Sequence, residues 1–190
     1  MNQNHSLFVN TPRNWSEYYG KISVFREYYL RVNDLSDILK PMITEQSEVL
    51  ILGCGTSLLG FELSANVTQI DFCKPVIDHM QLKEQKSEYL HMDARALRFP
   101  DCTFNLVLVK ALFEFQDDIQ SICQIIIESH RVLTKNGILL VISQINEEFM
   151  SDSLDIVKWQ KVKTLRTPVN NCCQNGKEER SDVQIFVCFK

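Results

Sequence analysis

Long apolar runs and an excess of basic residues are both missing from this chain. Its longest apolar stretches, such as residues 137–142, have the length of a strand, well short of the about 18 residues that a membrane-spanning helix needs. Twenty Lys and Arg oppose 24 Asp and Glu, which gives a net charge of −4. The sequence therefore offers no broad positive field for nucleic acid or anionic lipid, and we expect neither as a partner.

Cysteine motifs are missing as well. The seven cysteines are an odd number, and they contain neither a Cys-x-x-Cys pair nor a Cys/His spacing typical of zinc sites. We expect reduced thiols, no metal centre, and a reducing compartment: the cytoplasm or, as the alternative, the mitochondrion. The N-terminal segment has no apolar signal core and no arginine before Arg13, so no targeting leader is evident.

Glycine and proline are few, with six and five residues, and 45% of the chain is hydrophobic. These values exclude a disordered or collagen-like chain. A length of 190 residues predicts a single domain, 1–190, and we expect it to be monomeric. We divide it into an N-terminal helical lid at 14–40, rich in aromatic residues at helical spacing and closed by Pro41, a central core at 49–143, and a C-terminal helix and hairpin at 144–190.

The core alternates short apolar runs with helical periodicity, which is typical of βαβ units. We predict an α/β, Rossmann-like fold with a seven-stranded, mostly parallel sheet whose strands are 49–52, 67–71, 88–92, 104–109, 137–143, 162–166 and 183–188. Helices are expected near 57–64, 74–84, 117–134 and 147–157. The nearly unbroken apolar runs 49–52 and 106–109 should be central strands.

Two boundaries follow from polar and glycine residues. Asn136-Gly137 predicts a left-handed stop for helix 117–134. The polar residues 170–182 predict a long loop at the tip of a terminal antiparallel hairpin.

The most informative segment joins the first expected strand to the first helix. A Gly-Cys-Gly turn at 53–55 follows the run 49–52 directly, and such a turn lets backbone N–H groups approach a ligand. Asp71 ends the second strand, 18 residues beyond the first glycine, where a carboxylate can accept hydrogen bonds from both ribose hydroxyls. Asp93 follows the third strand and can accept one from an adenine amino group. Together they predict an adenosine cofactor at the carboxyl edge of the sheet.

What the glycine turn lacks narrows the choice of cofactor. A dinucleotide fingerprint needs a third glycine where this chain has Leu58, which disfavours NAD. The Gly-Lys-Ser/Thr of a phosphate loop is absent, which disfavours ATP. S-adenosyl-L-methionine carries no phosphate and remains the best match.

Six segments match a known sequence pattern: NWSEYY at 14–19, LGCGTS at 52–57, VTQIDF at 67–72, MDA at 92–94, FPDCTF at 99–104 and LVLVK at 106–110. Together they make nearly the whole chain resemble the class I S-adenosylmethionine-dependent methyltransferases. Within that class the chain resembles the methyltransferase-like protein lysine methyltransferases that act on elongation factor 1-alpha or on mitochondrial citrate synthase.

The resemblance implies a set of residues that approach the methionine part of the cofactor, hold its ribose, read its adenine edge or close over it: Trp15, Tyr19, Tyr28, Gly53, Gly55, Asp71, Phe72, Asp93, Ala94 and Lys110. It therefore makes residues 49–143 a cofactor-binding core. The aromatic members suit this role, because a sulfonium cation is favoured over aromatic faces and a lid excludes water.

The resemblance also makes Lys110 and Glu114 the candidate catalytic residues. After the fourth strand the family usually shows Asp-Lys-Gly-Thr-Leu-Asp, where this chain has VKALFE. Val109 thus replaces the first acid, whereas Lys110 and the final acid are retained. We expect Glu114 to align the amine of a substrate lysine at a mouth walled by Phe113, Phe115 and the helix of Trp15 and Tyr18.

A protein substrate with a lysine acceptor is the partner that this interpretation predicts, and a basic segment would suit the acidic chain. Nucleic-acid amine methylation is disfavoured, because no Asn/Asp-Pro-Pro-Tyr motif follows the fourth strand. Two alternatives stay open: a small-molecule methyltransferase and a catalytically inactive scaffold that binds the cofactor, for which the loss of the acid at Val109 is the best support.

Overall fold

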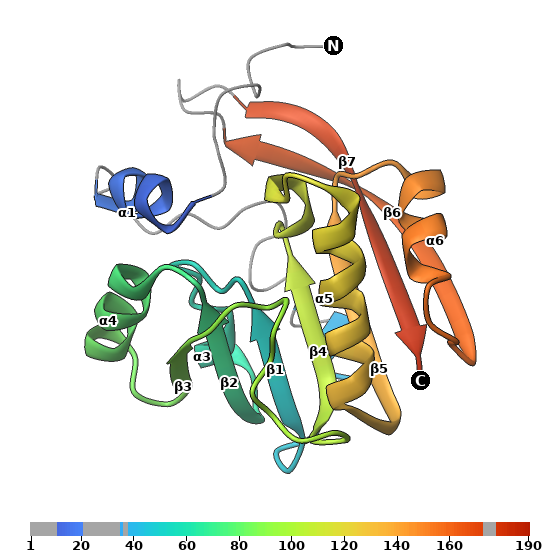
Figure 1. The fold of residues 1–190 in the computed structure, drawn as a ribbon, viewed down its shortest axis with the longest axis horizontal. Helices are drawn as coiled ribbons and strands as arrows, with labels where there is room; N and C mark the ends of the chain where they lie inside the picture. The colour runs from blue at the N-terminus through green and yellow to red at the C-terminus, as the bar shows by residue number, and fades with distance from the viewer. Residues whose placement is uncertain (1–10, 21–34, 36–37, 173–177) are drawn as a thin grey trace.

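A seven-stranded mixed sheet forms the centre of the molecule (Figure 1). The computed structural model describes residues 11–20, 35, 38–172 and 178–190. The strands are β1 Glu48–Leu52, β2 Asn66–Asp71, β3 Glu88–His91, β4 Phe104–Lys110, β5 Leu133–Ser143, β6 Lys161–Cys172 and β7 Glu178–Phe189. Their order in the sheet is β3-β2-β1-β4-β5-β7-β6. The first five are parallel, and β7 pairs antiparallel with both β5 and β6. This confirms the predicted fold class.

Helices cover both faces of the sheet. They are α1 Pro12–Gly20, α3 Leu59–Glu62, α4 Lys74–Lys83, the 3-10 turn η1 Phe113–Phe115, α5 Ile119–Val132 and α6 Glu147–Leu154. The apolar sides of α5 and α6 pack in one core cluster, and α5 lies along β4 and β5 (Figure 1). Residues of α1, α3 and α4 pack in the other cluster, together with Leu35 and Leu39.

Successive residues of the central strands β1 and β4 belong alternately to the two core clusters. In β1, Val49 and Ile51 face one cluster while Leu50 and Leu52 face the other, and all four are at most 3% exposed. Side chains of a strand point alternately to opposite faces, so a strand covered on both faces must be apolar throughout. The prediction that these two runs are central strands is confirmed.

The end of α5 differs from the prediction. Residues 117–134 were expected to form a helix that stops at a left-handed Asn136-Gly137, but α5 ends at Val132 and β5 begins at the next residue. Gly137 lies inside β5 and is not left-handed. A Cβ there would come within 2.9 Å of Leu133 Cδ2, beside an irregularity in the pairing of β4 with β5. The glycine therefore serves close packing in a strand.

The hairpin tip also differs from the prediction. The register of β6 with β7 runs without interruption from Lys161↔Phe189 to Cys172↔Glu178. Most of the residues expected as the loop 170–182 are therefore strand residues, and 173–177 lie outside the described residues. Polarity misled the prediction, because strand pairing uses backbone groups and tolerates polar side chains away from the core.

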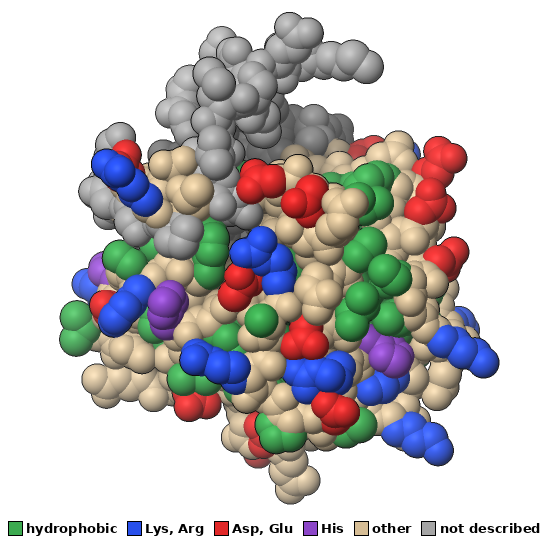
Figure 2. Space-filling view, in the orientation of Figure 1, with side chains coloured by type: hydrophobic (Ala, Val, Ile, Leu, Met, Phe, Trp, Pro, Cys, Tyr) green, Lys and Arg blue, Asp and Glu red, His purple; other side chains and the backbone are tan. Residues whose placement is uncertain are grey.

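The N-terminal lid is described in part. Of the predicted helical stretch 14–40, α1 covers 14–20, and residues 35, 38 and 39 are also helical. Tyr28 lies outside the described residues. None of the described helices is both long and apolar enough to cross a membrane. Acidic and basic side chains are interspersed over the face that Figure 2 shows.

Candidate functional site

One pocket lies at the carboxyl ends of β1, β2, β3 and β4, beneath α1. It brings together every described residue that the sequence assigned to cofactor binding: Trp15, Tyr19, Gly53, Gly55, Asp71, Phe72, Asp93, Ala94 and Lys110. The carboxyl edge of an open parallel sheet is where α/β proteins bind ligands, because the loops that leave neighbouring strands diverge there.

The glycine turn after β1 requires both of its glycines. Gly53 and Gly55 have φ values of +63° and +53°, in the left-handed region that disfavours side chains. A Cβ on Gly53 would come within 2.8 Å of Leu112 Cδ1, and one on Gly55 within 2.5 Å of the Tyr19 hydroxyl. The turn is therefore shaped for close approach by neighbouring groups. Cys54 lies between the two glycines. Burial raises the pKa of its thiol most, and the nearby charge of Asp71 raises this pKa further.

Asp71, the last residue of β2, is 7% exposed and braces this turn. Its Oδ2 accepts the N–H of Gly55 at 3.0 Å, and its Oδ1 accepts the N–H of Cys73 at 2.8 Å. Burial raises the pKa of Asp71 above its ordinary value, and the N–H groups of Cys73 and Gly55 and the charge of His91 partly oppose the rise. The carboxylate thus fixes the glycine turn while it lines the pocket.

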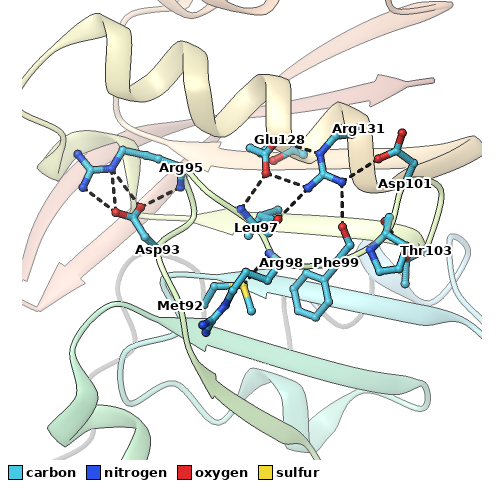
Figure 3. Close-up of polar contacts among 12 residues, drawn as sticks. Met92, Asp93, Arg95, Leu97, Arg98, Phe99, Asp101, Thr103, Glu128 and Arg131 are labelled. Carbon is cyan, nitrogen blue, oxygen red and sulfur yellow. Dashed lines mark hydrogen bonds and ion pairs between the residues drawn. The ribbon is translucent and has the colours of Figure 1, made fainter.

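Asp93 follows β3 and is held differently, by the fork of Arg95 (Figure 3). Its Oδ1 accepts the N–H and Nε of Arg95 at 2.9 and 3.0 Å, and its Oδ2 accepts Nη2 at 2.7 Å. Partial burial opposes ionisation of Asp93, but the hydrogen bonds and charge of Arg95 outweigh it and hold its pKa below the ordinary value. Asp93 is therefore an ionised acceptor at the rim of the pocket.

The segment after Asp93 is fastened to α5 by Arg131 and Glu128 (Figure 3). Arg131 donates from Nη2 to the carbonyl of Leu97 at 2.9 Å and from Nη1 to that of Phe99 at 2.8 Å. Glu128 binds Arg131 and accepts the N–H of Leu97 at 2.8 Å. Charge-assisted bonds of this kind are stronger than neutral ones, so they fix the path of the chain that leaves the pocket.

An aromatic wall closes the side of the pocket next to α1. The ring of Trp15, which is 8% exposed, stands edge-on to Phe115 at 4.9 Å between centroids and stacks with Tyr19 at 5.7 Å. Lys110, the last residue of β4, and Ala111 after it also line the pocket. Ala111 has a φ of +52°, which an L side chain rarely adopts, and its N–H donates to the carbonyl of Ile142 at 3.0 Å.

The residues after Ala111 depart from the prediction in two respects. Phe113 does not wall the mouth: it is 2% exposed and packs in the core cluster beside α5, because η1 turns its side chain inward. Glu114 is not among the residues that line the pocket. Its Oε1 accepts the N–H of Gln144 at 2.6 Å, which places it where β5 ends. Its catalytic role stays a prediction.

Sequence reasoning missed Arg95 and Leu112, both of which line the pocket. The signal for Arg95 was available, since an arginine two residues after an acid at a strand end can bind it. Leu112 gave no signal, because its contact with Gly53 depends on the turn after β4.

The residues that line this pocket fit S-adenosylmethionine. The cofactor offers ribose hydroxyls to a buried carboxylate, and it carries a cation that suits an aromatic wall. Among the described residues no group of three or more His, Cys, Asp and Glu is placed to hold a metal ion.

Comparison with known proteins agrees with this geometry. Residues 50–141, from β1 to β5, match a family described as "Methyltransferase domain". These residues, just under half of the chain, are therefore similar to a methyltransferase domain, as the sequence predicted. Its fold is that of a SAM-dependent methyltransferase from Methanosarcina mazei, with a TM-score of 0.70 at 17% identity over 80% of this chain and 96% of that one.

Two relatives of this chain come from Mus musculus. "EEF1A lysine methyltransferase 4" is 28% identical over 140 residues, which are 64% of this chain and 51% of the relative. "eEF1A lysine and N-terminal methyltransferase" is 31% identical over 133 residues, which are 62% of this chain and 19% of the relative. The chain thus aligns with about half of the first relative and a fifth of the second. The family match and the shared fold indicate S-adenosylmethionine as the cofactor, as the sequence predicted.

Proposed function

We propose that this chain is a methyltransferase that transfers methyl groups from S-adenosylmethionine to the side chain of a lysine in a protein substrate similar to elongation factor 1-alpha or citrate synthase. The observation that carries the proposal is the single pocket in which Asp71, the glycine turn and the aromatic wall of Trp15 and Phe115 meet. The names of the two mouse relatives support the lysine acceptor.

When bound, the cofactor supplies a methyl group on a sulfonium, and an amine takes that methyl with its lone pair while the carbon–sulfur bond breaks toward sulfur. The protein's part is positioning, which alone can lower a barrier by several kcal/mol, about 7–11 in well-oriented cases. Asp71 and the glycine turn would hold the cofactor, and Trp15, Tyr19 and Phe115 would exclude water from the reacting atoms. The net charge of −4 would favour a basic substrate segment.

A second candidate function is that of an inactive scaffold that binds the cofactor. Val109 favours it, because this residue stands where the resembling family has an acid and is 1% exposed in the apolar core. A turnover assay with purified elongation factor 1-alpha and citrate synthase separates the two candidates. The enzyme transfers label from the cofactor to one of these proteins or to a protein found by mass spectrometry of a cell lysate, whereas the scaffold binds the cofactor and yields no product.

Glu114→Gln tests the catalytic role of this acid. A glutamine oxygen can still accept the N–H of Gln144, so the local structure should persist and affinity for S-adenosylhomocysteine should be unchanged. We expect turnover of the protein substrate to fall, because a neutral side chain aligns a lysine amine less well. Glu147→Gln, at an exposed residue of α6, is the matched control and should leave turnover unchanged. Wild-type turnover in Glu114→Gln would refute the role.

A further inference from the structure

The rim of the pocket at the end of β3 carries an ion pair whose two members both line the pocket, Asp93 and Arg95. Three groups of Arg95 bind the carboxylate of Asp93, namely its backbone N–H, Nε and Nη2, at 2.9, 3.0 and 2.7 Å (Figure 3). A planar fork that meets a carboxylate in this way fixes the plane of the carboxylate as well as its charge.

We propose that Arg95 determines the base specificity of the cofactor site, by holding Asp93 as a fixed, acceptor-only carboxylate that admits a 6-amino purine and rejects a 6-oxo purine. Arg95 is thus a positioning residue that acts through Asp93. The inference rests on the cofactor and is independent of the methyl acceptor, so it stands even if the lysine proposal fails.

The chemistry of the two bases explains the expected selectivity. The 6-amino group of adenine donates hydrogen bonds, and an ionised carboxylate only accepts them. The 6-oxo group of hypoxanthine is itself an acceptor, so it would face the carboxylate of Asp93 with no hydrogen between the two acceptors. A mismatch of this kind in a binding site lowers affinity by about 10- to 100-fold.

Arg95 is needed for this selectivity because Asp93 alone could escape it. An unpaired carboxyl at a half-exposed rim can rotate, and once protonated it can donate its O–H to a 6-oxo group. Arg95 prevents both, since it occupies both carboxyl oxygens and lowers the pKa of Asp93. The charges of Asp118 and Asp117, where α5 begins, also act on Arg95 and favour its cationic form.

Stability of the fold does not explain the pair. The side chains of Arg95 and Asp93 are 45% and 40% exposed, and ion pairs as exposed as this one contribute little to stability. Removal of the Arg95 side chain should therefore leave the protein folded, which makes its effect on binding measurable.

The test is calorimetric titration of the full chain with S-adenosylhomocysteine and with S-inosylhomocysteine, whose bases differ in the 6-amino or 6-oxo group and in the hydrogen that N1 of the 6-oxo base carries. Wild type should prefer the adenosine compound by about 10- to 100-fold. In Arg95→Met the preference should fall to within about threefold, and Arg95→Lys, which keeps the charge without the fork, should fall between. The control Arg98→Met removes a neighbouring arginine that binds the carbonyl of His91, and it should keep the wild-type preference.

Each contrary outcome is distinct. An undiminished preference in both Arg95 variants would overturn the role of Arg95. An equal loss of affinity for both compounds would show a merely structural role and would also overturn it. Absence of any preference in wild type would overturn the reading of adenine by Asp93, and the proposal with it. None of these outcomes bears on lysine methylation, which the turnover assay tests separately.

Discussion

Two carboxylates lie at the ends of neighbouring strands in the pocket, and the protein holds them in opposite ways. Asp71 is 7% exposed and binds two backbone N–H groups, whereas the side chain of Asp93 is 40% exposed and binds chiefly the side chain of Arg95. Burial raises the pKa of the first, and Arg95 lowers the pKa of the second.

The two carboxylates therefore have different roles: Asp71 stabilises the fold around the pocket, and Asp93 contributes to the specificity of binding. The partners of Asp71 are backbone groups, so no substitution of a neighbouring side chain removes them directly. The principal partner of Asp93 is one side chain that a single substitution can remove. We therefore expect changes at Asp71 to affect both folding and binding, and changes at Asp93 to affect binding with little effect on folding.

The largest contrast should appear in stability. Asp71→Ala leaves the buried N–H groups of Gly55 and Cys73 without their acceptor, and we expect the free energy of unfolding to fall by about 2 kcal/mol or more. Asp93→Ala breaks an exposed ion pair and should cost less than about 1 kcal/mol. Urea denaturation measures both, and equal losses would contradict the comparison.

A substitution in the glycine turn beside Asp71 should lower the free energy of unfolding almost as much. Gly55→Ala places a side chain at a left-handed φ and against the Tyr19 hydroxyl, and we expect a loss of about 1–2 kcal/mol. Tyr19→Phe removes the hydroxyl, so the double variant should lose at least about 0.5 kcal/mol less than the sum of the single variants. Strict additivity in urea denaturation would show that the hydroxyl does not restrict Gly55.

The two pKa shifts predict a pH dependence of binding that belongs to Asp71. Below its raised pKa, Asp71 is protonated and accepts ribose hydroxyls poorly, so affinity for S-adenosylhomocysteine should fall by up to about tenfold per pH unit. Asp93, whose pKa is lowered, stays ionised in that window. Calorimetry from neutral pH down to the acid range measures the decline. Affinity that stays constant down to the ordinary pKa of aspartate, about 3.9, would be inconsistent with this account.

The contribution of Asp71 to the stability of the fold should change with pH in the opposite direction to its contribution to binding. Because its pKa is higher in the folded than in the unfolded chain, the folded state binds the proton more tightly. As pH falls from the raised pKa to the ordinary one, this residue adds stability while it weakens binding.

The smallest effect concerns Ala111, on the opposite side of the pocket. Ala111→Gly relieves a left-handed φ worth about 1–2 kcal/mol, but glycine costs about 0.5–1 kcal/mol of entropy in the unfolded chain. The difference predicts a gain of about 0–1.5 kcal/mol in the free energy of unfolding, which urea denaturation measures. Ala96→Gly, at a residue that is not left-handed, is the control and should destabilise the protein. Loss of stability in Ala111→Gly would contradict the prediction.

Features set by neighbours in the sequence could be predicted. The unbroken apolar runs identified β1 and β4, and the spacing from the glycine turn to Asp71 brought both to one pocket. These features follow from the alternation of side chains along a strand and from the common edge at which parallel strands end.

Features set by packing could not be predicted. Phe113 looked like a wall of the mouth but turns into the core with η1, and Gly137 looked like a helix stop but packs inside β5. Leu112 approaches Gly53 only because the chain turns at left-handed Ala111. In each case the local pattern was compatible with two conformations, and contacts distant in sequence decided between them.

The central claim is that this pocket holds S-adenosylmethionine with its ribose on Asp71. Its most direct test is calorimetric titration of wild type and Asp71→Asn with S-adenosylhomocysteine, because asparagine keeps the size of the side chain and loses one of the two acceptors. We predict one-to-one binding to wild type and a loss of binding in Asp71→Asn while circular dichroism shows that the variant is folded. Wild-type affinity in the folded variant would contradict the claim.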